Sequence, residues 1–128
     1  MKLVRSIAMV ALMCLVLPVY AGGDFGTLKA KITNARQTLV DMMGGKIDAD
    51  QQKKVKESAD EVSTYLSGLA APKGKEAKFE ELKTLWSQFK ATRENELVPA
   101  ILKGEKDKSK TIGTGVQKER MDKMMAII

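Results

Sequence analysis

The chain has 128 residues, enough for one domain, and carries 22 Lys and Arg against 16 Asp and Glu, for a formal net charge of +6. It contains one cysteine and no histidine, so the usual general base, the thiolate nucleophile and the commonest metal ligands are nearly absent. No strand-like alternation of useful length appears, and we therefore expect an all-helical protein.

The first 21 residues have the order of a secretory signal peptide. Lys2 and Arg5 form a positive start, Ile7 to Leu17 form an apolar run, and a small residue, Ala21, ends the segment. The apolar run is shorter than the roughly 20 residues that a membrane span needs, although a retained anchor is the alternative. We expect residues 1–21 to be removed, residues 22–128 to form the domain, and the protein to be periplasmic or secreted, with no membrane association after cleavage.

Cleavage would change the composition of the domain. The net charge falls from +6 to +4 when Lys2 and Arg5 are removed, and the single cysteine, Cys14, leaves with them. No disulfide is then available, even in a compartment that permits one. The remaining chain can bury a modest core, so a homodimer is a further expectation because association would add stability.

The first two predicted helices carry heptad seams. The segment from Asp24 to Met43 places apolar residues at spacings of three and four, and Gly44 and Gly45 end it. The second segment opens at Asp48 with Gln51 three residues on, which is a form of the capping box. The two seams are Phe25, Leu28, Ile32, Ala35, Leu39 and Met42, then Val55, Ala59, Val62, Leu66 and Leu69.

The third predicted helix has an interrupted seam. Its apolar rhythm from Phe79 to Phe89 continues onto two charged residues, Arg93 and Glu96, and resumes one position later at Leu97, Ala100 and Ile101. Pro99 lies inside this pattern, where a proline costs roughly 3 kcal/mol. We expect a kink close to the end of the helix, which Gly104 closes in a left-handed conformation.

The fourth predicted helix runs from about Glu105 to the end and has a looser stripe. Its apolar positions are Ile112, Val116, Met121, Met124 and Ile128, with Gly113 and Gly115 between them. Short connections make consecutive helices antiparallel, and a seam period near 3.5 favours left-handed crossings. The sequence therefore predicts an all-α fold, an up-down-up-down antiparallel four-helix bundle after the signal peptide.

Several chemistries are disfavoured. Catalysis would depend on a Ser–Lys pair one turn apart, Ser87 with Lys83 or Ser109 with Lys106, and solvated helix faces explain both pairs more simply, so we expect no enzyme. Haem ligation lacks its histidines, and no cofactor is expected. The lysines alternate with acids, which argues against nucleic acid. Methionine sulfur suits Cu(I), which leaves copper as an alternative for Met42, Met43, Met121, Met124 and Met125.

One stretch resembles a known family. The pattern W-x-x-F-x-x-x-R-x-x-E-L-V-P-A-I-L-K-G-E, from Trp86 to Glu105, resembles the third-helix end of the four-helix-bundle ligand-binding domain of methyl-accepting chemotaxis receptors. The first segment, LKAKITNARQTLVDMM, is also similar to that family's first helix. The receptors continue into a second membrane span and a signalling rod, which this sequence lacks, so we expect a stand-alone exported sensor-like protein. The resemblance implies a small-molecule site near the Gly104 end, often at a dimer interface.

Four residues are candidates for that site. Arg36, Arg93, Thr111 and Thr114 are each about 10 to 17 Å from the same end of the predicted bundle at 1.5 Å per residue. Two guanidinium groups beside hydroxyls would suit a small carboxylate. Alternatively, Arg93 pairs with Glu94 or Glu96 at the surface. The competing functions are a haem-free, cytochrome-like scaffold that acts by protein contact, and Cu(I) binding. No catalytic or metal-binding residue is expected.

Overall fold

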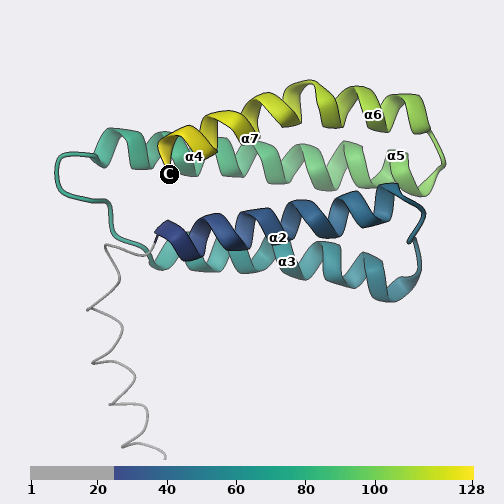
Figure 1. Ribbon diagram of the computed structural model, residues 1–128, viewed down its shortest axis with the longest axis horizontal. Helices are drawn as coiled ribbons and strands as arrows, with labels where there is room; N and C mark the ends of the chain where they lie inside the picture. The colour runs from purple at the N-terminus through teal and green to yellow at the C-terminus, as the bar shows by residue number, and fades with distance from the viewer. Residues whose placement is uncertain (1–24) are drawn as a thin grey trace, which may run out of the picture.

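The computed structural model describes residues 25–128, which form helices joined by short connections and contain no strand (Figure 1). The all-α prediction is confirmed for this part of the chain, while the predicted signal peptide, 1–21, and residues 22–24 of the predicted domain lie outside it. None of the described helices is both long and apolar enough to span a bilayer. The described residues form four long helical segments. The first two are α2 (Phe25–Met43) and α3 (Ala49–Gly68). The third is α4 (Glu76–Thr92), which continues through a π-helical turn η1 (Arg93–Leu97) into α5 (Val98–Leu102), and the fourth is α6 (Lys106–Thr114) with α7 (Val116–Ile127).

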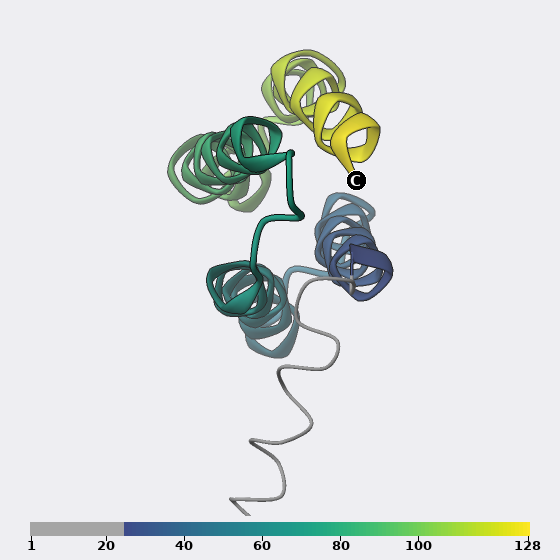
Figure 2. The ribbon, with the colours of Figure 1, turned by 90° about the vertical axis from the view of Figure 1, so that its left-hand side faces the viewer.

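The segments lie side by side as two hairpins. Helix α2 packs most extensively on α3, and α4 packs most extensively on α7. The end-on view in Figure 2 places the four segments around a common centre. One core cluster draws residues from all four of them, including Ile32, Val62, Leu82 and Met124, which are all fully buried. A smaller cluster of Leu39, Met42, Val55 and Leu97 fills the end near Gly104.

The seams of the first three segments predict the core well. Every predicted seam residue from Leu28 to Phe89 is at most 8% exposed, and only Phe25, at the start of α2, is partly exposed. Asp48 is the N-cap of α3 as predicted, because its side chain accepts a bond of 2.8 Å from the Gln51 backbone N–H. The second half of the capping box is absent, since the Gln51 amide instead donates to the Thr38 carbonyl oxygen at 2.7 Å. This bond ties α3 to α2.

The interruption of the third seam is a π-helical turn. In Arg93–Leu97 the backbone N–H of Val98 bonds to the carbonyl oxygen of Arg93, five residues back instead of four. A π turn accommodates one extra residue, which shifts the apolar stripe by one position and explains its return at Leu97. Pro99 lies in the first turn of α5, directly after the π turn. It has no backbone N–H that needs a partner there, so the proline is tolerated at this position.

The fourth segment differs from its prediction. Gly115, with φ −99° and ψ −105°, divides it into α6 and α7 and changes the phase of the stripe. Val116, a predicted seam residue, is 42% exposed, and its neighbour Gln117 is buried and donates to the Phe89 carbonyl oxygen at 2.9 Å. Gly104 has φ +76°, the left-handed conformation that was predicted for the turn before this segment.

Candidate functional site

The four predicted site residues occupy two different environments. Arg93 is fully buried at 0% exposure, whereas Arg36, Thr111 and Thr114 are exposed. The Thr114 hydroxyl donates to the Lys110 carbonyl oxygen of its own helix at 2.7 Å. The structure therefore places the two arginines apart, one guanidinium in the core and the other at the surface.

The buried guanidinium of Arg93 joins the third segment to the α2–α3 hairpin. One terminal nitrogen, Nη1, donates to the Ala35 carbonyl oxygen, and the other, Nη2, donates to the Val55 carbonyl oxygen, both at 2.7 Å. Longer contacts of 3.4 Å reach the hydroxyls of Thr38 and Ser58, which lie 2.9 Å from each other. Among residues 25–128, Nε of Arg93 is the only buried side-chain nitrogen or oxygen without a hydrogen-bond partner.

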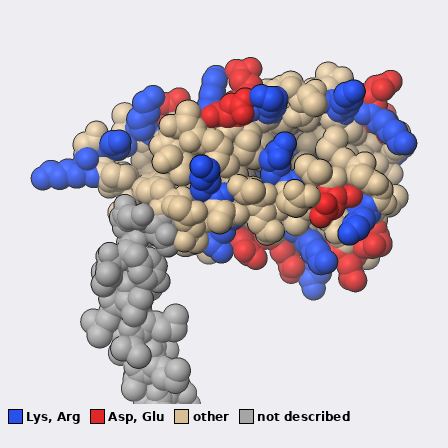
Figure 3. Space-filling model, in the orientation of Figure 1, with Lys and Arg blue, Asp and Glu red and all other residues tan. Residues whose placement is uncertain are grey.

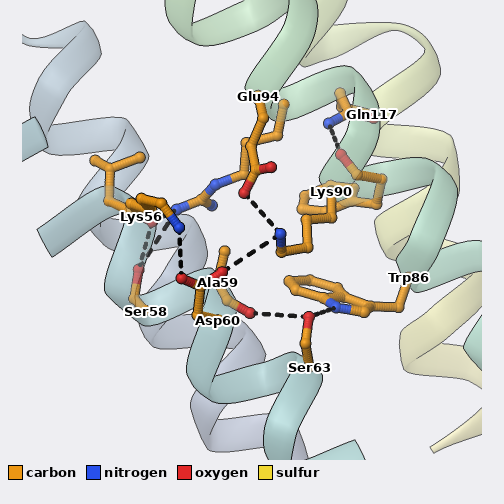
Figure 4. Close-up of polar contacts among 12 residues, drawn as sticks. Lys56, Ser58, Ala59, Asp60, Ser63, Trp86, Lys90, Glu94 and Gln117 are labelled. Carbon is orange, nitrogen blue, oxygen red and sulfur yellow. Dashed lines mark hydrogen bonds and ion pairs between the residues drawn. The ribbon is translucent and has the colours of Figure 1, made fainter. Parts of the chain in front are cut away.

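Within the part of the chain that the structure describes, no carboxylate forms an ion pair with this cation. Glu94 pairs with Lys90 at 2.9 Å, and Lys90 also approaches Asp60 at 3.4 Å, as Figure 4 shows. The alternative of a surface pair between Arg93 and Glu94 is therefore not what forms. Burial lowers the pKa of Arg93 to about 10 because desolvation disfavours the charged form, against a smaller attraction from Glu94. Arg93 is still protonated at neutral pH.

Three polar contacts align α4 and its π turn with α3. The Trp86 indole N–H donates to the Ser63 hydroxyl at 3.0 Å, and the two further contacts are Lys90 with Asp60 and Arg93 with Val55. As the residue number rises along α4 and its π turn, the number of the partner residue on α3 falls. Such contacts also fix the register between the two hairpins.

The opposite end of the molecule carries two adjoining cavities. The larger has a volume of about 580 Å³ and is lined by Lys75, Lys78 and Lys123 with one acid, Glu81, and small or apolar residues. The smaller, of about 250 Å³, is lined by Lys75 and Lys78 together with five apolar residues: Phe25, Pro72, Phe79, Ile127 and Ile128. The two cavities share Lys75, Lys78 and Ile127.

The positive charge of this end is weakly compensated. Lys78 pairs with Glu81 at 3.4 Å and Lys123 with Glu119 at 3.1 Å, and both pairs are solvent-exposed and therefore weak. Lys75 forms no ion pair with any residue of the described range. Lys75 is also the N-cap of α4 and supplies no side-chain capping bond, so the first-turn N–H groups of α4 face this region without a side-chain cap. Figure 3 shows basic side chains projecting where α4 begins in Figure 1.

The candidate methionine ligands are divided between the two core clusters and the surface. Met42 belongs to the core cluster near Gly104, while Met121 and Met124 belong to the larger cluster. Within residues 25–128 no group of three or more His, Cys, Asp or Glu side chains is arranged to hold a metal ion. Of the methionines that could be copper ligands, Met42, Met121 and Met124 are buried in the core as packing residues are, whereas Met43 is 39% exposed.

Neither a protein-family model, nor a curated protein, nor a solved structure matches the chain. The likeness to chemoreceptor sensor domains therefore depends on the quoted residues alone. Sequence reasoning missed the lysine-lined cavities because their walls come from α2, α4, α7 and the connection before α4. The only local signal is the cluster of basic residues in KGKEAK, from Lys73 to Lys78.

Proposed function

We propose that this protein is an exported, non-catalytic, sensor-like helical bundle that binds a small anionic molecule. The observation that carries the proposal is the cavity of about 580 Å³ lined by three lysines and one glutamate. Its volume lies in the range of ordinary small-molecule sites, about 300–1,000 Å³. An excess of lysine side chains on the walls of a concave surface favours an anion.

The proposed topology is an antiparallel up-down-up-down four-helix bundle. The opposite numbering of the α3–α4 contacts supports this arrangement, as do the short turns at Gly44–Gly45 and at Gly104. The order of the segments in Figure 1 agrees with it. In such a bundle the cavities lie at the end where α2 and α4 begin.

The lysine-lined cavity and the predicted arginine site are at opposite ends, so they are separable. A ligand at the arginine site would have to displace the two backbone acceptors of Arg93, which are held at 2.7 Å. The lysine-lined cavity requires no such rearrangement. The carboxylate site predicted from the sequence remains a prediction, which the same experiment tests; its residues are Arg36, Arg93, Thr111 and Thr114.

The experiment is a calorimetric titration of the purified exported protein with inorganic phosphate, acetate and succinate. We expect Lys75→Gln to weaken anion binding about tenfold, since hydrogen bonds to charged groups are worth about 1.5–3 kcal/mol. The matched control, Lys103→Gln, changes an exposed lysine at the other end and should leave the affinity unchanged. Loss of binding in Arg36→Ala with no effect of Lys75→Gln would move the site to the predicted arginines. No binding of any anion would end the proposal.

Export is tested separately by the N-terminal sequence of the protein recovered outside the cytoplasm. We expect it to begin at Gly22 or within a residue or two of it, because Ala21 ends the signal-peptide pattern. Protein that begins at Met1 would indicate a retained anchor.

A second candidate function is a haem-free scaffold that acts by protein contact. The separation of Arg36 from Arg93 favours it, because a carboxylate site at that end needed the two to converge. A flat anion screen, together with a partner recovered through an exposed face, would select this function.

A further inference from the structure

We propose that the anion bound at the lysine-lined end is an amphiphile: a carboxylate head on a single alkyl chain, the chemistry of a fatty acid. The inference rests on the proposed function and specifies the ligand of the same site. It follows from the smaller cavity, whose apolar walls a purely ionic ligand would leave unused.

The two cavities form a gradient from charged to apolar. The larger has three lysines on its walls, and the smaller has only Lys75 and Lys78, which stand where the two meet. Beyond that junction the smaller cavity is walled by aromatic and aliphatic side chains. Two of these, Phe25 and Phe79, form an edge-to-face pair with ring centroids 5.9 Å apart at 89°. A head group at the junction would leave an attached alkyl chain against these rings.

The charges at the junction fit a carboxylate. Lys75 has no ion pair in the described range, so its ammonium group is available to a ligand without loss of an existing contact. Lys78 forms an ion pair with the exposed Glu81, and the two charged groups are 3.4 Å apart. The start of α4, which has no side-chain cap, adds a favourable potential for an anion to the positive charge of the two lysines.

The volume limits the length of the chain. A cavity of about 250 Å³ holds about eight groups the size of a water molecule, and a methylene is of similar size. Each buried methylene should tighten binding about fourfold, the equivalent of about 0.8 kcal/mol. Affinity should therefore rise steeply from acetate to octanoate and then level off near decanoate.

The test is a calorimetric titration of the exported protein with acetate, butyrate, octanoate and decanoate, each below its micelle concentration. We expect octanoate to bind at least 50-fold more tightly than butyrate. Octyl glucoside, which has the same chain and no charge, should bind at least tenfold more weakly than octanoate. Equal affinity for butyrate and octanoate would overturn the inference and leave the anion-binding function standing. Failure of every anion, short or long, would remove both.

Two variants separate the head from the tail. Lys75→Gln should weaken butyrate and octanoate by the same factor of about ten, because it removes only a head contact. Ile128→Asn, at a residue that lines only the smaller cavity, should weaken octanoate at least tenfold and leave butyrate unchanged, with Leu102→Asn, an exposed leucine at the far end, as the matched control. Octyl glucoside binding as tightly as octanoate would contradict a charged head group. Co-sedimentation with phosphatidylglycerol vesicles without octanoate binding would assign this end to a membrane surface and overturn the inference.

Discussion

Replacement of Arg93 tests whether the buried guanidinium stabilises the fold by its charge or by its volume. The residue is 0% exposed and bonds to the carbonyl oxygens of Ala35 and Val55. Both carbonyls lie in helix interiors, where each also accepts the N–H four residues further on. Removal of the guanidinium therefore leaves neither carbonyl unpaired, and the hydroxyls of Thr38 and Ser58 keep their bonds to carbonyls in their own helices.

The magnitudes then differ sharply among three variants. Arg93→Ala leaves a cavity the length of the lost side chain and should cost about 2–5 kcal/mol. Arg93→Met restores most of that volume without a buried charge, so its stability should lie within about 1 kcal/mol of the wild type, on either side. Arg93→Lys keeps the charge but loses the two-pronged geometry, and should cost about 2–3 kcal/mol.

Urea unfolding followed by circular dichroism measures the free energy of unfolding of all three variants. The expected losses are measurable because the unfolding free energy of a small domain is only about 5–15 kcal/mol. Equal m-values would show that the variants unfold from similarly compact states. The reasoning is wrong if Arg93→Met loses as much stability as Arg93→Ala, since the hydrogen bonds would then outweigh both volume and desolvation.

Three further predictions concern the core, the glycines and pH. Leu39→Ala should cost about 2–5 kcal/mol because Leu39 is 5% exposed, whereas Val40→Ala, at 41% exposed, should cost less than about 0.5 kcal/mol in the same urea assay. Gly113→Ala should stabilise the protein by about 0.5–1 kcal/mol, since the new Cβ would meet only a methionine methyl at 3.8 Å. Gly115→Ala should destabilise it, since the new Cβ would lie 2.7 Å from a backbone oxygen. The two variants should therefore shift the melting temperature in opposite directions. Because the pKa of Arg93 is lowered in the folded state, the unfolded chain binds more protons than the folded one above about pH 10. The stability of the wild type relative to Arg93→Met should therefore be constant from pH 6 to 9 and rise above about pH 10. A decrease in that range would contradict the direction of the pKa shift.

The sequence predicts the helices and their buried faces because both follow from local periodicity. The seam residues and the cap at Asp48 depend on residues a few positions apart, and the structure confirms them. The hydrophobic periodicity of a sequence does not show in which direction a long polar side chain points. Gln51 fits a capping box in sequence, yet its amide reaches Thr38 on the neighbouring helix.

Arg93 shows the same limit at the candidate site. Its charge interrupted the apolar seam, and the sequence favoured either a ligand-binding role or a surface ion pair for it. The structure buries it because carbonyl and hydroxyl oxygens of two other segments converge there, which no spacing within one helix reveals. The cavities were missed for a related reason, since Phe25, Lys78 and Ile127 are far apart in the chain and meet only in the folded protein.

The π-helical turn contains one residue more than an ordinary α-helix would need there. We expect that this residue can be deleted without harm only if Pro99 is changed as well. Deletion of Glu94 would let an ordinary α-helix carry the apolar stripe on to Leu97 with its spacing of three and four restored. The same deletion would place Pro99 inside a continuous helix, where its ring would crowd the carbonyl oxygen four residues before it. The inserted residue and the proline thus form a coupled pair of changes, in which each lowers the cost of the other. A deletion that is harmful alone should become mild when Pro99 is also replaced by alanine.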